Sequence, residues 1–348
     1  MLRFKVHSPT RADLAGGTLD IWPLYCFQGE AKTINVALNL CAIAQFEVTS
    51  SPSFKLEIQS MGAETFRLEA AIERNAIAKL PASLQFPVYV VSEYLAQKTE
   101  LPSIAIQMSL RSEAPVRSGL GGSSALCVAM IRGLARIFND FQDQGWQWAM
   151  LNWVKDCEAG FLRTPTGTQD YLASLFGGMK CYVSRTGGVD CVNYPDGVLE
   201  ELSERMVVLF SGEMHQSGLS NWELFKKAIA GDPSVLGGLE KIRVLADQLD
   251  GELRGHLSWK HIGQYLTEEW NIRRETLHVE TQRLEEILQF LHAKKVYGAK
   301  VCGAAQGGSI LVLVEPSQKD ALAKACQSAG IDVLPASANP SAVSATEY

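Results

Sequence analysis

Apolar and polar residues alternate along several short stretches in the first half of the chain, and this pattern predicts β-strands. In the stretch SIAIQMSL, Ile104, Ile106, Met108 and Leu110 occupy every second position, so their side chains share one face of a strand. The stretches AIAQFEVTS and FKLEIQS alternate similarly, and later MKCYVS, MVVLFSG and SILVLVE have the composition of strands. Residues 3–60 are therefore predicted to be mostly strand.

Apolar residues recur with helical spacing in the stretch ALCVAMIRGLARIF, which begins at Ala125. Further helices are predicted near residues 146–161, across 217–295 with interruptions near 231–236 and 251–260, and near 317–329. Strands and helices that alternate, with a helical block late in the chain, favour an α+β fold in two lobes. The polar, turn-rich stretch YPDGVLEELSER places the boundary near residue 200.

The composition is that of a globular protein. The 348 residues are enough for two domains, and the net charge of −6 gives no overall basic field for nucleic acid. No segment approaches the ~20 apolar residues of a membrane span, and the first ten residues have no apolar stretch long enough for a signal peptide. Eight cysteines without a C-x-x-C pair argue against zinc. We therefore expect a cytoplasmic protein with no membrane or nucleic-acid partner, and a homodimer is left open.

The stretch from Arg117 to Ala125 holds three glycines and three serines within seven residues, between a predicted strand and a predicted helix. Glycines let a backbone approach a ligand closely, and the free N–H groups at a helix start favour an anion such as phosphate. It is not a Walker loop, because no Lys-Ser or Lys-Thr follows, and it lacks the third glycine of the dinucleotide fingerprint. A serine-capped helix start is the competing interpretation.

Two other stretches strengthen the phosphate interpretation: SPTRADLAGGTLD near the start (motif one) and GAKVCGAAQGGSILVLV near the end (motif three). The three together, in this order, resemble the three motifs of the GHMP kinases, and Pro115 to Ala125 resembles the superfamily's phosphate loop. The resemblance implies a two-lobed GHMP kinase fold with the active site between the lobes. It also implies an N-terminal nucleotide-binding α/β domain over residues 1–200 and a C-terminal ferredoxin-like α+β domain over 201–348.

Motif one separates the branches of the superfamily. Arg11 stands where mevalonate kinases carry lysine, and PTRADLAGGTLD resembles the Pro-x-Arg-x-x-Phe-Ala-Gly-Gly-Gly-Thr-Asp opening of D-glycero-D-manno-heptose 7-phosphate kinases. It departs in Leu14 and in Thr18-Leu19, which replace Phe and Gly-Thr. GTQDYLASLFGG and LTEEWNIRRETL also resemble segments of that branch, although Tyr171 replaces a Gln and Ala305-Gln306 replace two glycines of motif three.

The resemblance implies roles for single residues. Asp170 matches the catalytic aspartate, which either takes the proton of the acceptor hydroxyl or orients that hydroxyl. Arg11 beside it would keep the carboxylate ionised. Ser123, or Ser124 in the other register, and Glu158 match the magnesium ligands, and a hydroxyl with one carboxylate suits magnesium. A helix-cap aspartate, a solvated glutamate and an ion pair of Arg11 with Asp13 or Asp20 remain the structural alternatives.

The remaining residues implied by the resemblance bind the two substrates. ATP with magnesium would contact the phosphate loop through Pro115, Gly119, Leu120, Gly121, Gly122, Ser123, Ser124 and Ala125. The acceptor would be held by Asp20, Gly17, Thr18, Arg273, Arg274 and Gly303. If the acceptor carries its own phosphate, Arg273 or Arg274 would clamp it, although both arginines fit a solvated helix face equally well.

The sequence therefore predicts an ATP- and magnesium-dependent small-molecule kinase that transfers the γ-phosphate to a hydroxyl of a heptose phosphate or related sugar. A kinase for an unphosphorylated sugar such as fucose or galactose is the alternative within enzymes. A non-catalytic sugar- or nucleotide-sensing relative is the alternative outside them, and the presence of Asp170, Ser123 and Glu158 argues against it.

Overall fold

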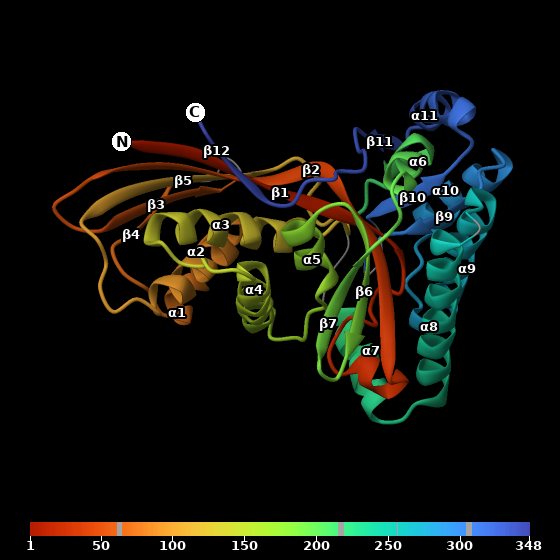
Figure 1. The fold of residues 1–348 in the computed structure, drawn as a ribbon, viewed down its shortest axis with the longest axis horizontal. Helices are drawn as coiled ribbons and strands as arrows, with labels where there is room; N and C mark the ends of the chain where they lie inside the picture. Colours follow the sequence, from red (N-terminus) through yellow and green to blue (C-terminus); the bar gives the residue numbers. More distant parts are fainter. Residues whose placement is uncertain (61–64, 215–218, 256, 304–307) are drawn as a thin grey trace.

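The computed structural model describes residues 1–60, 65–214, 219–255, 257–303 and 308–348, and Figure 1 shows its two groups of elements. Each group is built on one β-sheet. The larger sheet comprises β1 (Leu2–Ala15), β2 (Glu30–Ser50), β3 (Lys55–Ser60), β4 (Phe66–Leu68), β5 (Ile104–Ser112), β6 (Met179–Arg185), β7 (Gly188–Asn193) and β12 (Ser344–Glu347). The smaller sheet comprises β8 (Met206–Phe210), β9 (Gly298–Val301), β10 (Ser309–Leu313) and β11 (Asp332–Leu334).

The long strands β1 and β2 form the centre of the larger sheet and pair antiparallel along most of their length. One half of β2 pairs with β5 and the other half with β6, so the sheet branches along this strand. Register shifts between Pro9 and Thr10 and between Asp13 and Ala15 interrupt the β1–β2 ladder. Such irregularities turn side chains in new directions, and here they fall within motif one.

Helices cover one face of the larger sheet (Figure 1). They are α1 (Arg74–Ile77), α2 (Ala82–Leu95), α3 (Gly122–Phe138), α4 (Trp146–Leu162) and α5 (Gln169–Phe176). The predicted alternation of SIAIQMSL is confirmed, because Ile106, Met108 and Leu110 of β5 are buried in the core that these helices share with the sheet, whereas Gln107 and Ser109 are exposed. The helix predicted near residues 146–161 is confirmed as α4.

The smaller sheet has the order β11-β8-β10-β9 with every neighbouring pair antiparallel. Numbered along the chain this order is 4-1-3-2, the arrangement of a ferredoxin-like sheet, as the resemblance implied. The helices that follow the larger sheet in sequence are α6 (Val198–Arg205), α7 (Leu219–Ile229), α8 (Pro233–Arg254), α9 (Trp259–Leu277), α10 (Gln282–Ala293) and α11 (Lys319–Ser328). Two short 3-10 helices complete the elements, η1 (Leu24–Gln28) and η2 (Pro316–Gln318).

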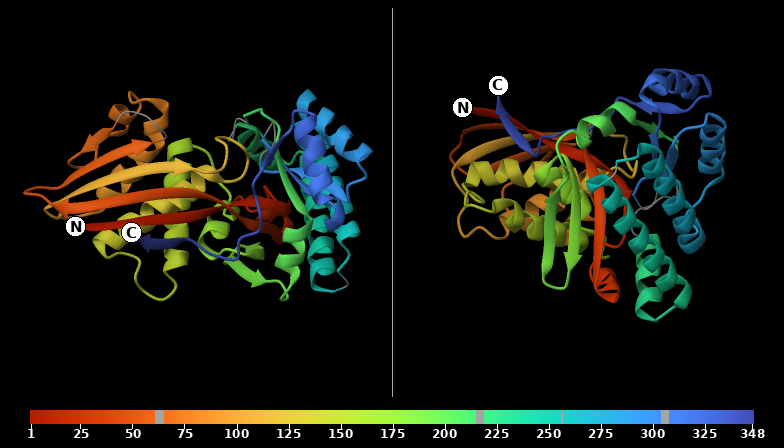
Figure 2. Two further views of the ribbon diagram at one scale, coloured as in Figure 1. Left: turned by 90° about the horizontal axis from the view of Figure 1, so that it is seen from above. Right: turned by 45° about the vertical axis from the view of Figure 1, so that its right-hand side comes forward.

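The elements around the larger sheet and those around the smaller sheet contact each other through buried apolar side chains. One apolar cluster contains Ala12 and Leu14 of β1, Leu266 of α9, and Leu311 and Leu313 of β10, so motif one is packed against the C-terminal elements. The chain also returns to its start, because β12 pairs antiparallel with β1 and the two termini lie close together (Figures 1 and 2). Among the residues described, no helix is long and apolar enough to cross a membrane.

Candidate active site

The Gly/Ser stretch forms a loop that leads into α3, as predicted. Gly119 and Gly121 have φ angles of 76° and 73°, which glycine adopts without strain. Gly121 is the N-cap of α3 and no side chain caps this helix, so the serine-cap interpretation is wrong. A Cβ on Gly121 would also lie 3.0 Å from the carboxyl carbon of Asp170. The glycine therefore allows this loop to lie directly against that carboxylate.

The carbonyl groups of the loop are held by other parts of the protein. The backbone N–H of Arg11 donates to Leu120 O at 2.9 Å, the Arg11 guanidinium donates to Gly119 O at 2.5 Å, and the N–H of Ser309 donates to Ser118 O at 2.7 Å. The N–H groups of Gly119 through Ser124 have no acceptor among the described residues. A run of free N–H donors at the positive end of a helix is a site for a phosphate.

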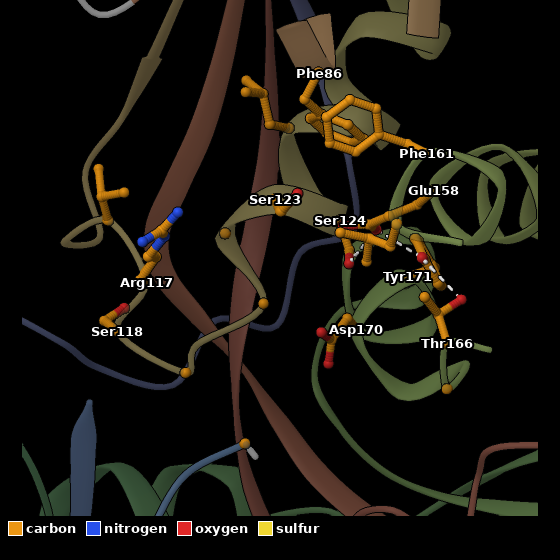
Figure 3. Close-up of a pocket in the computed structure, with 18 of the residues that line it drawn as sticks. Phe86, Arg117, Ser118, Ser123, Ser124, Glu158, Phe161, Thr166, Asp170 and Tyr171 are labelled. Carbon is orange, nitrogen blue, oxygen red and sulfur yellow. Dashed lines mark hydrogen bonds between the residues drawn. The ribbon is translucent and has the colours of Figure 1, made fainter. Parts of the chain in front are cut away.

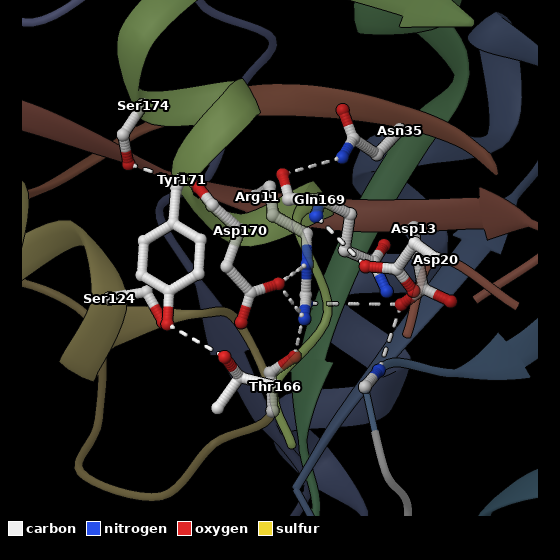
Figure 4. A network of polar contacts seen from close by, with 12 residues as sticks. Arg11, Asp13, Asp20, Asn35, Ser124, Thr166, Gln169, Asp170, Tyr171 and Ser174 are labelled. Atoms are coloured by element: carbon white, nitrogen blue, oxygen red, sulfur yellow. Dashed lines mark hydrogen bonds and ion pairs between the residues drawn. The ribbon is translucent and has the colours of Figure 1, made fainter. Parts of the chain in front are cut away.

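Arg11 and Asp170 are joined beside this loop (Figure 4). The Arg11 Nε donates to Asp170 Oδ1 at 2.7 Å, and a second guanidinium nitrogen lies 2.5 Å from the same oxygen. Arg11 is buried, whereas the Asp170 side chain is one-quarter exposed and lines the cavity. Asp170 lies in the first turn of α5 after the N-cap Thr168, so it is not a capping residue. Its Oδ2 has no partner among the described residues and can accept a proton from a ligand.

Glu158 is buried behind the phosphate loop and accepts two hydrogen bonds on one oxygen (Figure 3). Ser124 Oγ donates to Glu158 Oε2 at 2.7 Å, and the Tyr171 hydroxyl donates to the same atom at 2.6 Å. Burial raises the pKa of Glu158, although the hydroxyl groups of Tyr171, Ser124 and Ser123 act in the opposite direction. The structure thus pairs Glu158 with the alternative register, Ser124, while Ser123 is exposed at the cavity.

Asp20 forms a second carboxylate site in the cavity. Its Oδ2 accepts a hydrogen bond from the Gln169 N–H at 2.9 Å, and its Oδ1 is buried without a partner among the described residues. Burial raises the pKa of Asp20 to about 6. A Cβ on Gly167 would lie 2.1 Å from Asp20 Oδ2, so only glycine permits this close approach. The free Oδ1 and the unpaired Gln169 Oε1 are acceptors for hydroxyl groups of a ligand.

A buried ionic network lies beneath motif one. Lys300 donates to Asp13 at 2.6 Å and to Glu269 at 2.8 Å, and none of the three side chains is exposed. The charges of Lys300 and Arg11 outweigh the effect of burial and hold the pKa of Asp13 well below its usual range. Sequence analysis missed Lys300 and Glu269, because only the fold brings α9 and β9 against β1.

Arg273 also belongs to this buried layer. It is 1% exposed and donates to Gly17 O at 2.9 Å, to Gly303 O at 2.9 Å and to Thr18 Oγ1 at 3.2 Å. The prediction that Arg273 clamps a substrate phosphate therefore does not fit the geometry, since its donors hold motif one against motif three. Arg274 does not line the cavity and pairs with Glu285 at 3.2 Å, so it is not a clamp either.

Motif three contributes through its first glycine. Gly303 lines the cavity and donates its N–H to Asp13 Oδ1 at 2.8 Å. Gly17, another predicted acceptor residue, touches the network rather than the cavity lining. Ala305, Gln306 and Gly307, which also belong to motif three, lie outside the described residues.

These groups surround one cavity of about 670 Å³, within the range of small-molecule sites. Figure 3 shows Phe86 and Phe161 on one side of Ser123 and Ser124, and Asp170 and Thr166 on the other side. Further lining residues that sequence analysis did not assign include Pro87, Leu126, Leu162, Thr164, Pro165, Thr166, Gly167 and Met214. Of the predicted loop residues, Leu120 and Ala125 are buried and do not line the cavity.

Two models of known protein families match two segments of the chain. Residues 87–178 match the model of the GHMP kinases N terminal domain, and residues 255–332 match that of the GHMP kinases C terminal. The first match contains the phosphate loop, Glu158 and Asp170, and the second contains Arg273 and Gly303. Most residues that line the cavity thus fall within the first match or in motif one, and the second match contributes Gly303.

Two curated relatives align with nearly the whole chain. The D-glycero-alpha-D-manno-heptose 7-phosphate kinase of Campylobacter jejuni is 25% identical over 332 residues, which are 93% of this chain and 93% of that protein. The bifunctional fucokinase/GDP-fucose pyrophosphorylase of Arabidopsis thaliana is 23% identical over 331 residues, which are 91% of this chain but 30% of that protein.

Solved structures show the same fold. A D-glycero-D-manno-heptose 1-phosphate kinase from Bacteriodes thetaiotaomicron has a TM-score of 0.76 at 20% identity, with 100% of this chain and 99% of that chain covered. The galactokinase of Lactococcus lactis complexed with galactose has a TM-score of 0.77 at 14% identity, with 98% and 95% covered. Both family models match in order, and a curated kinase aligns with 93% of the chain, so the chain belongs to the GHMP kinases and is a phosphotransferase.

Proposed function

We propose that this protein transfers the γ-phosphoryl group of ATP to a hydroxyl of a sugar. The observation that carries the proposal is the shared cavity in which free N–H donors of the phosphate loop lie against the Arg11–Asp170 pair. Phosphoryl transfer requires this combination of phosphate binding and a positioned acceptor group. The sugar class is supported by the two curated relatives, which are named as a heptose 7-phosphate kinase and a bifunctional fucokinase.

The two ends of the cavity suit the two substrates. The apolar end with Phe86 and Phe161 would take the adenine of ATP, and the loop N–H groups would hold its phosphates. At the polar end Asp20 Oδ1 and Gln169 Oε1 would accept hydrogen bonds from sugar hydroxyls. The acceptor oxygen would then lie between Asp170 and the γ-phosphate, which is the in-line arrangement that the transfer needs.

In the transfer step the acceptor oxygen forms a bond to the γ-phosphorus while the bond to the bridging β–γ oxygen breaks, and ADP leaves. The hydroxyl proton passes to Asp170 Oδ2, which has no protein partner among the described residues, while Oδ1 stays bound to Arg11. Arg11 thus orients the carboxylate, and its hydrogen bond to Gly119 O fixes the distance between base and loop.

Magnesium suits the same cavity. The Glu158 carboxylate and a serine hydroxyl of the Ser123–Ser124 pair, with Ser123 as the residue predicted from the sequence, line it beside the α3 N-terminus and supply the hard oxygen ligands that magnesium takes. When bound, magnesium would neutralise negative charge on the phosphate oxygens. Among the residues described, no cluster of three or more His, Cys, Asp or Glu side chains is placed to hold a metal, so magnesium would bind one carboxylate, a serine hydroxyl and the phosphates.

The first candidate for the acceptor is a heptose phosphate, the substrate in the name of the curated relative. The second candidate is an unphosphorylated sugar. The second candidate is favoured by the positions of Arg273 and Arg274. Within the described chain the basic side chains that line the cavity are Arg11 and Arg117, and Arg11 is already bound to Asp170. The domain division at residue 200, the cytoplasmic location and a homodimer remain predictions from the sequence.

A coupled assay of ADP release tests the proposal with ATP, magnesium and a panel of acceptors. The panel comprises D-glycero-D-manno-heptose 7-phosphate, galactose and fucose, with water as the blank. We expect ADP release that depends on one acceptor and is lost in Gly121→Val, whose side chain would collide with Asp170 and strain the loop. ADP release that does not depend on any acceptor would contradict the proposal, as would no release at all.

A further inference from the structure

Thr18 has an unusual backbone conformation at the acceptor end of the cavity. Its φ is 80°, in the left-handed region that β-branched residues rarely adopt because of steric strain. The other non-glycine residues with positive φ in the described chain are not β-branched: Arg117, Asn139, Phe141, Arg163, His278 and Lys295. A glycine would take this conformation without strain, so the strain accompanies the presence of a side chain here.

The surroundings of Thr18 hold it in this conformation. The Leu19 N–H donates to Gly16 O and the Ile21 N–H donates to Thr18 O, each at 3.2 Å, and these bonds fix the turn. From the other side, the buried Arg273 guanidinium donates to Thr18 Oγ1 at 3.2 Å. This contact sets the side-chain rotamer, because the hydroxyl oxygen must face α9.

Thr18 is 5% exposed and lines the cavity two residues before Asp20. Asp20 offers its free Oδ1 to a ligand (Figure 4). Thr18 and Asp20 thus line the same cavity, and the Thr18 side chain cannot turn away while Arg273 holds its oxygen.

We propose that Thr18 is a specificity-determining residue that limits the size of the acceptor beside Asp20. The inference rests on the proposed function, since it concerns the acceptor of that same reaction. The side chain fills space that a glycine would leave open, and the bond from Arg273 keeps it there. Acceptors with an added group at this end of the cavity are excluded by the side chain.

The test compares wild type with Thr18→Gly on the best acceptor of the panel and on its mono-O-methyl ethers. An O-methyl group is of the size that the substitution vacates. We expect kcat/KM for at least one ether, relative to the parent acceptor, to rise about tenfold or more in Thr18→Gly. The melting temperature should stay within about 2 °C of wild type or rise, because relief of backbone strain offsets the lost hydrogen bond.

Two further variants serve as controls. Thr18→Ser keeps the hydroxyl and the Cβ and should retain the wild-type preference within about threefold. His278→Gly removes a side chain at a positive φ of 49° at the exposed C-cap of α9, the helix that carries Arg273, and should leave the preference unchanged.

The outcomes are distinguishable. If wild type phosphorylates an acceptor and Thr18→Gly keeps the same ratio for every ether within about twofold, the inference is wrong and the proposed function stands. A fall of several degrees in the melting temperature with an equal loss for all acceptors would show a structural role and overturn the inference. If wild type phosphorylates no acceptor, the proposed function fails and the inference fails with it.

Discussion

Asp13 and Asp20 are both buried carboxylates of motif one, yet their surroundings move their pKa values in opposite directions. Asp13 contacts Lys300, Arg11 and the Gly303 N–H, and these groups hold its pKa well below the usual range. Asp20 receives the Gln169 N–H on one oxygen and keeps the other unpaired, and burial raises its pKa to about 6. Both oxygens of Asp13 are bound by groups of the protein, whereas Asp20 keeps one oxygen that can bind a ligand.

Asp13→Asn is expected to give the largest loss of stability. It leaves Lys300 with Glu269 as its one anionic partner in a fully buried site, and removing one member of a buried ion pair costs about 3–5 kcal/mol. The measurement is the free energy of unfolding by denaturant at pH 7. Lys226→Met, which removes the exposed pair with Glu223, is the control and should cost less than about 1 kcal/mol. Equal losses in the two variants would contradict the account of the network.

Asp20→Asn is expected to increase the stability of the fold at pH 7 while weakening the acceptor site. A rise in pKa from 3.8 to about 6 corresponds to a destabilisation of about 3 kcal/mol at pH 7, and the amide removes most of it while still accepting from the Gln169 N–H. Loss of a hydrogen bond to a charged group lowers kcat/KM for the acceptor by about 10- to 150-fold. The KM for ATP should change little. A loss of stability comparable to that of Asp13→Asn would show that Asp20, like Asp13, is needed for the fold, and would contradict its assignment to ligand binding.

The pH dependence of acceptor binding sharpens the same comparison. A sugar hydroxyl donates to ionised Asp20, so affinity should fall below pH about 6, with a limiting slope of about tenfold per pH unit. Titration of the acceptor between pH 5 and 8, with a non-hydrolysable ATP analogue present, measures it. Asp20→Asn should bind with an affinity independent of pH over this range. Wild-type affinity that stays constant or increases toward pH 5 would exclude Asp20 as the acceptor ligand.

The two carboxylates also contribute to stability with opposite pH dependence. The folded-state pKa of Asp20 is raised, so its unfavourable contribution appears as the pH rises from about 4 to 6 and is absent below that window. The folded-state pKa of Asp13 is lowered, so its favourable contribution is present above its ordinary value of 3.8 and is lost as the pH falls below it. The stability gained in Asp20→Asn should therefore disappear near pH 4.

Tyr171→Phe is expected to have the smallest effect. It removes one of two hydrogen bonds to Glu158 Oε2 and leaves the one from Ser124, at a cost of about 1 kcal/mol. The magnesium concentration needed for half of the thermal stabilisation by an ATP analogue should rise severalfold, because Glu158 is less firmly oriented. Tyr182→Phe is the control, since the Tyr182 hydroxyl is buried without a partner among the described residues, and it should be neutral. An unchanged magnesium requirement in Tyr171→Phe would remove Tyr171 from the site.

Features that depend on local sequence were predictable. The glycines at 119 and 121 and the apolar spacing after Ala125 predicted the loop and α3, and the strand pattern predicted β5. Arg11, Asp20, Glu158 and Asp170 line one cavity, and the roles that the resemblance implied for them stay predictions. They could be named from the sequence because their motifs resemble those of a known family.

Features that depend on long-range contacts were not predictable. Whether Arg273 faces a ligand or the protein depends on carbonyl groups of Gly17 and Gly303, and the first of these lies 256 residues away in sequence. The pairing of Lys300 with Asp13 spans 287 residues. The conformation of Thr18 follows from the turn and from α9 together, because threonine by itself disfavours a positive φ.

Turnover by Asp170→Asn tests the central claim most directly. The measurement is transfer of the γ-phosphate of ATP to the preferred acceptor, followed as the labelled sugar phosphate, together with ATP-analogue binding by the same variant. We predict that turnover falls by roughly 10²–10⁴-fold, as expected for loss of a general base, while nucleotide binding stays close to wild type. A variant that keeps most of its turnover would contradict the assignment of Asp170 and the mechanism built on its pairing with Arg11.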